Sequence, residues 1–162
     1  MKTMQHYIEQ LIDDLAEAKK HVPPEPVFSE DYDEFEKQML AIETAPDVPA
    51  KKLYGISYEE LPPPERLTEK QMQQLIEAIA DTWAAFNCFI IFPDNVPIKL
   101  QYELIREQFA EPIHYMPGWS NNYDFCSGWC PDCEIAEYCT NKDDIWTSEE
   151  LEEERKKSTK KR

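Results

Sequence analysis

The chain has 162 residues, of which 41% are hydrophobic and 31% are charged, a composition from which one domain with a modest core can fold. Its formal net charge of −16 repels nucleic-acid phosphates, so the acidic body is not expected to bind nucleic acid. Only 3 glycines stand beside 13 prolines, which excludes glycine-rich phosphate loops and dinucleotide-binding fingerprints, because both need several closely spaced glycines.

The start of the chain lacks the pattern of a secretory signal, because Glu9, Asp13 and Asp14 interrupt its only apolar stretch. The longest apolar run, residues 86–92, is far shorter than the roughly 20 residues that span a bilayer. We therefore expect a soluble cytoplasmic protein without membrane contact. In that reducing compartment, clustered cysteines bind a metal more readily than they form disulfides.

The N-terminal region, residues 1–45, is predicted to form a helical hairpin. Over residues 3–20, apolar residues recur at helical spacing, with lysines at the end of the segment. Ser29 can cap a second helix, whose first turn is acidic. The apolar residues on one face of this second helix are Tyr32, Phe35, Met39 and Ile42. Residues 46–66 contain five prolines and are predicted to be a stiff linker.

Residues 67–142 are predicted to form an α+β core that includes the cysteine cluster. Thr68 and Gln71 have the spacing of a capping box, which predicts a helix to about Asn87. A buried strand is expected over 88–92, followed by a helix with apolar residues at helical spacing, which are Ile98, Tyr102, Ile105 and Phe109. The expected sheet is small and antiparallel, packed with two helices.

A β-hairpin is predicted immediately before the cysteines. Its strands are Ile113–Met116 and Trp119–Phe125, and Pro117 and Gly118 suit the central positions of a type II turn. The last region, residues 143–162, is predicted to be a charged tail whose residues 155–162 include six basic residues. We expect this tail to be solvated, and contact with RNA is the alternative.

Four cysteines near the end of the chain carry the strongest chemical signal. Cys126, Cys130, Cys133 and Cys139 have the spacing C-x3-C-x2-C-x5-C. Four thiolates fit either tetrahedral zinc or an iron–sulfur cluster, and the spacing does not select one metal. We expect a structural zinc ion, with a [4Fe–4S] cluster as the alternative. His114 is a candidate to replace one thiolate, although a half-exposed strand histidine is the expected reading.

Parts of this cysteine segment resemble known families. The stretch WCPDC at 129–133 is similar to the active-site dithiol of thioredoxin-related proteins, which implies thiol–disulfide exchange by Cys130 and Cys133 as an alternative. Cys130, Cys133 and Cys139, with Cys88 far upstream, resemble the one-plus-three cysteine staple of the [4Fe–4S] cluster in RecB-type nucleases. The apolar stretch CFIIF at 88–92 favours Cys88 as an apolar strand residue.

A longer resemblance covers roughly residues 54–140. The stretches YGISYEELPPPERLTEKQM and PIKLQYELIRE, together with the cysteine segment, resemble small uncharacterised Bacteroidetes proteins with a C-terminal four-cysteine segment. The resemblance implies a recurring domain without an assigned activity.

Catalytic motifs are not found in the sequence. Paired carboxylates are so frequent in this acidic chain that adjacency does not indicate acid–base catalysis. No nucleophile elbow surrounds Ser57, Ser120 or Ser127. We therefore expect a metal-binding interaction or adaptor protein with a basic protein partner, and an acidic nucleic-acid mimic is the remaining alternative.

Overall fold

The computed structural model of the chain describes residues 3–92, 95–119, 123–124, 149, 152–153 and 155–157. The chain divides into two compact units. The first unit comprises Met1–Phe89 and Ile98–Tyr123, and the second comprises Ile90–Pro97 and Asp124–Arg162.

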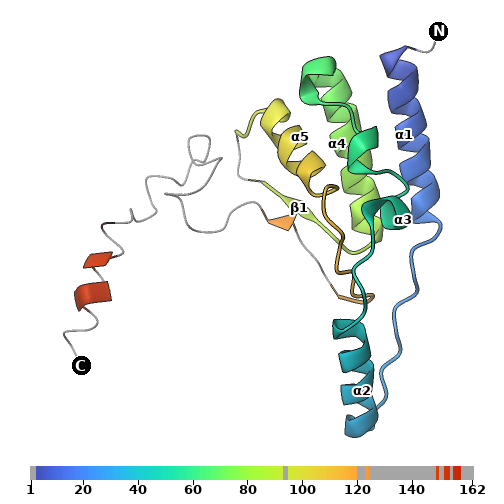
Figure 1. Ribbon diagram of the computed structural model, residues 1–162, viewed down its shortest axis with the longest axis vertical. Helices are drawn as coiled ribbons and strands as arrows, with labels where there is room; N and C mark the ends of the chain where they lie inside the picture. The colour runs from blue at the N-terminus through green and yellow to red at the C-terminus, as the bar shows by residue number, and fades with distance from the viewer. Residues whose placement is uncertain are drawn as a thin grey trace. The chain divides into compact units, whose positions relative to one another are not determined.

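Three helices of the first unit pack side by side: α1 (Met4–Lys19), α4 (Glu69–Ala85) and α5 (Ile98–Glu107). Figure 1 shows α4 between the other two, and it contacts both. A wide apolar face makes these two contacts possible, because the buried residues of α4 recur at i, i+3, i+4 and i+7. They are Met72, Leu75, Ile76, Ile79, Thr82 and Trp83.

Local signals define the starts of these helices, as the sequence predicts. The Thr68 side chain accepts a hydrogen bond from the Gln71 N–H at 3.1 Å. The Gln71 side chain accepts one from the Thr68 N–H at 3.0 Å, which completes the capping box of α4. Thr3 is the N-cap of α1, and its side chain accepts a hydrogen bond from the His6 N–H at 3.1 Å. The predicted helices over 3–20 and 68–87 are thereby confirmed.

Helix α1 packs against α4 along one apolar stripe. Polar side chains also join the two helices. The Gln5 amide donates to Gln74 at 3.1 Å, and Lys19 forms an ion pair with Asp81. The buried residues of α1 recur at i, i+3, i+7 and i+10, which are Ile8, Leu11, Leu15 and Ala18.

An aromatic cluster forms the centre of the core. The Tyr54 ring centroid lies 5.3 Å from that of Phe86 and 5.8 Å from that of Trp83. Trp83 stacks on Phe109 at 5.6 Å. Aromatic pairs at these separations contribute about 0.5–1.5 kcal/mol each beyond the burial of their surface. The cluster therefore joins α4 to chain segments that precede it and follow it.

The segment 46–66, predicted from its prolines as a linker, contributes to this core. It contains α3 (Ala50–Tyr54) and two short 3₁₀ helices, η1 (Tyr58–Glu60) and η2 (Pro64–Arg66). The prolines prevent one continuous helix, but they leave the apolar side chains between them available for burial. The buried ones are Ala50, Leu53, Tyr54, Ile56 and Leu61.

Side chains from two helices hold the backbone carbonyls of residues 60–62. The Tyr7 hydroxyl of α1 donates to the Glu60 carbonyl at 2.5 Å. From α5, the Arg106 Nε donates to the Leu61 carbonyl at 3.0 Å. The Tyr102 hydroxyl donates to the Pro62 carbonyl at 2.6 Å. Burial is the main cause that raises the pKa of both tyrosines above the ordinary value, so the hydroxyls remain protonated donors.

The predicted N-terminal hairpin is wrong. Helix α2 (Tyr32–Glu43) has no buried residue, and Figure 1 shows it away from α1, α4 and α5. The reason is that the apolar stripe of α1 is already buried in its packing on α4. The N-cap of α2 is Asp31 rather than Ser29, and its carboxylate accepts from the Glu34 N–H at 3.1 Å.

The predicted α+β fold class, with its small antiparallel sheet, is also wrong. The described residues are mainly helical, and their strands β1 (Ile90–Ile91) and β2 (Tyr123–Asp124) pair over two residues each. Ile113 does not start a hairpin. It instead forms an isolated antiparallel bridge with Val48, in which each N–H donates to the other residue's carbonyl at 2.7 Å.

The turn predicted within that hairpin is nevertheless present. Gly118 has φ +84°, and the Trp119 N–H donates to the Met116 carbonyl at 3.1 Å. This geometry suits proline followed by glycine in a type II turn. Residues 114–116 are not in a strand, and residues 120–122 and 125 of the prediction lie outside the described residues.

Few residues of the second unit are described. Val96 is buried, and residues 149, 152–153 and 155–157 of the predicted charged tail are helical and exposed. Across the described ranges of the chain, none of the helices combines the length and the apolar character needed to cross a membrane.

Replacing Tyr102 by phenylalanine tests how much the hydrogen bond to the Pro62 carbonyl stabilises the fold. Tyr102→Phe removes the donor to the buried Pro62 carbonyl, so we expect the free energy of unfolding to fall by about 1–3 kcal/mol. Urea denaturation of both proteins measures this difference. The matched control is Tyr32→Phe on α2, where the hydroxyl is exposed and a change within about 0.5 kcal/mol is expected. Equal effects of the two substitutions would contradict the prediction.

Candidate functional site

The four predicted metal ligands, Cys126, Cys130, Cys133 and Cys139, lie outside the described residues. Zinc or iron–sulfur binding by this segment therefore stays a prediction. Within the described ranges, no three His, Cys, Asp or Glu side chains come together so that they could hold a metal ion.

The two residues that the sequence offered as additional ligands have other surroundings. Cys88 is fully buried just after α4, and its thiol lies 3.6 Å from the Phe86 carbonyl. His114 lies on the surface, where its Nδ1 is 3.1 Å from a carboxylate oxygen of Asp47. Cys88 is thus part of the apolar interior, although it precedes β1 rather than lying in the strand.

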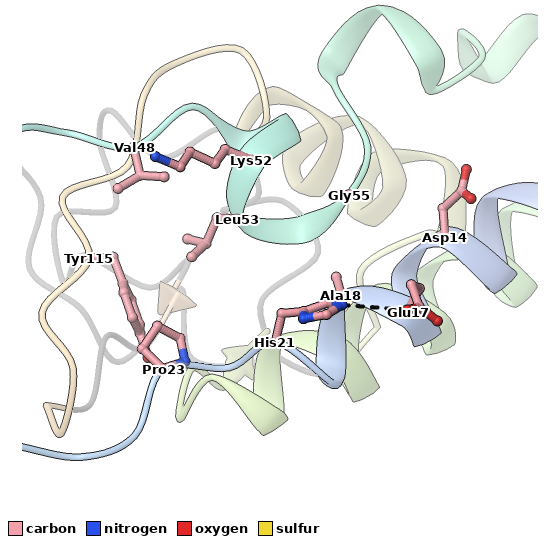
Figure 2. A pocket seen from close by; sticks show the side chains of 10 residues that line it. All are labelled: Asp14, Glu17, Ala18, His21, Pro23, Val48, Lys52, Leu53, Gly55 and Tyr115. Atoms are coloured by element: carbon pink, nitrogen blue, oxygen red, sulfur yellow. Dashed lines mark ion pairs between the residues drawn. The ribbon is translucent and has the colours of Figure 1, made fainter.

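A cavity of about 480 Å³ opens beside the end of α1 in the first unit. Figure 2 shows α1 and α3 on opposite sides of it, with Tyr115 and Pro23 at one end. Its volume is in the range of small-molecule sites. The residues that line it are Asp14, Glu17, Ala18, His21, Pro23, Val48, Lys52, Leu53, Gly55 and Tyr115.

The charged groups of this cavity lie around an apolar wall. Glu17 accepts from Lys20 at 3.0 Å and lies 3.4 Å from His21, the contact drawn in Figure 2. Lys20 and then His21 lower the pKa of the Glu17 carboxyl, so this residue remains ionised at neutral pH. Burial raises the pKa of the Tyr115 phenol, which leaves it protonated as a hydrogen-bond donor. The cavity could therefore bind a small polar molecule with an apolar portion.

Gly55 lines this cavity at the point where α3 approaches α1. It ends α3 in the left-handed conformation, with φ +83°. A Cβ atom at this position would lie 2.9 Å from the backbone oxygen of Asp14. Because that oxygen belongs to α1, the absence of a side chain allows α3 to approach α1 closely.

Helix α2 presents the second candidate surface, an exposed apolar face. Tyr32, Phe35, Met39 and Ile42 share one side of the helix, as the sequence predicts, because they recur at helical spacing. Tyr32 is 70% and Phe35 36% exposed, and Met39 and Ile42 are partly exposed. Phe28 packs edge-on against Phe35 with ring centroids 5.3 Å apart. We call the side formed by Tyr32, Phe35, Met39 and Ile42 the α2 face.

Acidic residues border the α2 face. At 100° per residue, Glu36 and Glu43 lie next to Tyr32 and Met39 around the helix. Asp31, Asp33 and Glu34 surround the start of the helix, and Lys37 is its only basic residue. The surface is therefore apolar in its middle and negative at its edge.

Comparison with known proteins adds no assignment, because no protein-family model, no curated protein and no solved structure matches this chain.

Sequence reasoning identified the residues of the α2 face but missed the cavity beside α1. The α2 face follows from helical periodicity, which a single segment of sequence contains. The cavity combines α1, α3 and Tyr115, which lie far apart in the chain, so no local pattern indicates it. Gly55, one of only 3 glycines in the chain, is the one sequence signal that could have marked a close approach of two segments there.

A glycine substitution tests the contact between α3 and α1. Gly55→Ala introduces the strain of a left-handed alanine, about 1–2 kcal/mol, and the contact with Asp14. We expect the free energy of unfolding to fall by at least about 2 kcal/mol. Gly118→Ala is the matched control, because its φ is similar but its Cβ would meet the Pro26 ring at 3.1 Å rather than a helix backbone. A larger loss from Gly118→Ala in urea denaturation would refute this account.

Proposed function

We propose that this protein is a metal-binding adaptor that docks a basic amphipathic helix on its α2 face. The single observation that carries the docking function is a capped helix of 12 residues with no buried residue and an exposed apolar side. The metal-binding function is supported by the spacing of Cys126, Cys130, Cys133 and Cys139.

Burial of the α2 face would supply the free energy for docking. Covering a large apolar side chain that is otherwise exposed contributes roughly 1.5–3 kcal/mol. Tyr32 is 70% and Phe35 36% exposed, and Met39 and Ile42 are partly exposed, so a partner can still remove apolar surface of this face from water. A helix laid along this face is the partner that matches a straight apolar stripe, because its own apolar residues repeat at the same spacing.

Charge selects among such partner helices. Glu36 and Glu43 border the stripe, and the segment 30–44 contains six acidic residues and one lysine. A partner with Lys or Arg beside its apolar stripe would place opposite charges across the edge of the interface. Such complementarity raises the association rate and suppresses binding of acidic partners.

The cysteine segment is proposed to hold one structural zinc ion in the reducing cytoplasm. Four thiolates fill a tetrahedral shell, so zinc bound there has no open position for a substrate. Binding of zinc contributes about 10–16 kcal/mol to the folding of small zinc-dependent peptides. A segment that is short of apolar residues can thus be folded by its metal.

Binding of a designed peptide tests the docking function. The probe is an amphipathic helical peptide of Leu and Lys, and the comparison peptide has Glu in place of each Lys. We expect the Leu/Lys peptide to shift the amide NMR signals of residues 32–43 and the Leu/Glu peptide to leave them unchanged. Tyr32→Ser with Met39→Ser should weaken binding at least about tenfold, because apolar burial is lost.

The matched control for this test is Ala41→Ser on the opposite side of α2. It should leave the affinity unchanged. Because general attraction of a basic peptide to an acidic protein does not depend on Tyr32 and Met39, equal binding by the double variant would disprove docking on the α2 face.

Metal analysis of the full chain, purified without added metal, tests the zinc site. We expect one zinc ion per chain, bound by a colourless protein, and loss of that zinc in the variant with Cys130→Ser and Cys133→Ser. The control is Cys88→Ala in the buried interior, which should keep the zinc.

Other results would replace zinc with one of the alternatives. A brown protein with iron and sulfide would indicate a [4Fe–4S] cluster. Metal-free protein with a reversible Cys130–Cys133 disulfide would indicate a thiol–disulfide oxidoreductase.

A further inference from the structure

A second cavity of the first unit, about 550 Å³ in volume, lies at the beginning of α1. None of the residues that line it belongs to the α2 face. Its walls come from α1, the proline-rich segment and α5. The residues that line it are Thr3, Met4, Tyr7, Glu59, Glu60, Leu61, Pro62, Pro63, Arg66 and Arg106.

Arg106 is held rigidly at this cavity. Its Nε donates to the Leu61 carbonyl at 3.0 Å, and its Nη1 donates to the Tyr58 hydroxyl at 3.0 Å. The guanidinium carbon also lies 4.2 Å from the centre of the Tyr58 ring. A guanidinium has five N–H donors, so these contacts orient the group and leave other donors for a ligand.

Both arginines of the cavity lack a carboxylate partner. Neither Arg66 nor Arg106 forms an ion pair with Asp or Glu in the part of the chain that the structure describes. This is unexpected in a chain with 33 acidic and 17 basic residues. Arg106 is half-buried and has lost part of its hydration, which favours an anion beside it, whereas Arg66 is exposed and adds a second positive charge to the cavity.

The carboxylates that line the cavity do not supply this anion. Glu60 binds Lys51 at 2.7 and 2.9 Å and accepts from the Ser57 N–H at 2.6 Å. Burial raises the pKa of Glu60, but Lys51 and Ser57 outweigh it and lower that pKa, so the carboxylate is ionised and already neutralised. Glu59 is exposed and forms no ion pair among the described residues.

The start of α1 adds positive potential to the same cavity. Thr3 and Met4 line it, and the first turn of α1 contains no acidic residue. The unpaired N–H groups at a helix N-terminus carry a partial positive charge that favours anions. Two arginines and a helix end thus face one cavity from three different elements.

We propose that this cavity binds a small organic anion, with its carboxylate or phosphate group at Arg66 and Arg106 and its apolar portion against Met4 and Pro63. The anionic group restores the counter-charge that Arg106 lacks. The apolar wall favours an organic anion over an inorganic one, because burial of hydrocarbon adds to the affinity. A cavity of this volume accommodates a molecule larger than a single oxyanion.

Titration of the full chain with four probes tests this site. The probes are phenyl phosphate, phenylacetate, inorganic phosphate and neutral benzyl alcohol, and binding is followed by the amide NMR signals of Thr3 and Met4 at low ionic strength. We expect saturable shifts from at least one of the two organic anions. Inorganic phosphate should bind more weakly, and benzyl alcohol should cause no shift. The stronger of the two organic anions identifies the preferred oxyanion.

Substitutions that are expected to change anion binding in opposite directions distinguish this site from a general effect of charge. Arg66→Gln should weaken binding about tenfold, because a charge-assisted hydrogen bond is lost. Glu59→Gln should strengthen binding, since it removes a negative charge from the same cavity. Lys99→Gln, an exposed cation of α5 outside the cavity, is the matched control and should have no effect.

Three results would overturn the proposal. They are the absence of a saturable shift with both organic anions, equal binding of benzyl alcohol or of inorganic phosphate, and equal affinities of the Arg66→Gln and Lys99→Gln variants.

Discussion

The helical unit depends on how the backbone of residues 60–62 is satisfied. Three successive prolines begin at residue 62, and prolines have no N–H groups with which to build a regular hydrogen-bonded element. The carbonyls of residues 60–62 instead accept from Tyr7 of α1 and from Arg106 and Tyr102 of α5. The Pro62 carbonyl is buried, and leaving it unpaired would cost about 1–3 kcal/mol. The three donors join the proline-rich segment to two helices that are distant in sequence. The same arrangement places the Arg106 guanidinium at the edge of the second cavity.

This core also determines what is left on the surface. Helices α1 and α5 cover the wide apolar face of α4, so α2 has no apolar neighbour within the core and keeps its own face exposed. The two proposed binding surfaces therefore have opposite character. The α2 face is bordered by Glu36 and Glu43 and suits a basic helix, whereas the cavity at Arg66 and Arg106 suits an anion.

Local signals predicted the helices well and the sheet poorly. Thr68 and Gln71 define the start of α4 because both partners of the capping box lie within one turn. The Pro117–Gly118 turn was predicted for the same reason, as it requires only the φ preferences of two residues. Ile113 was assigned to a hairpin strand, yet its backbone partner is Val48, from a segment that was predicted to be a linker. Strand pairing depends on which segment lies alongside, and this information is not contained in a short window of sequence.

The sequence by itself determined the positions of the main helices, the apolar side of α2, the negative charge and the four-cysteine spacing, because each depends on residues that are neighbours in the chain. Only the tertiary structure decided that α2 stays outside the core, that residues 46–66 contribute to it, and that Arg66 and Arg106 line one cavity. These features depend on which apolar faces meet first and on where buried polar groups find partners. Both are properties of the packed chain, and no single segment specifies them.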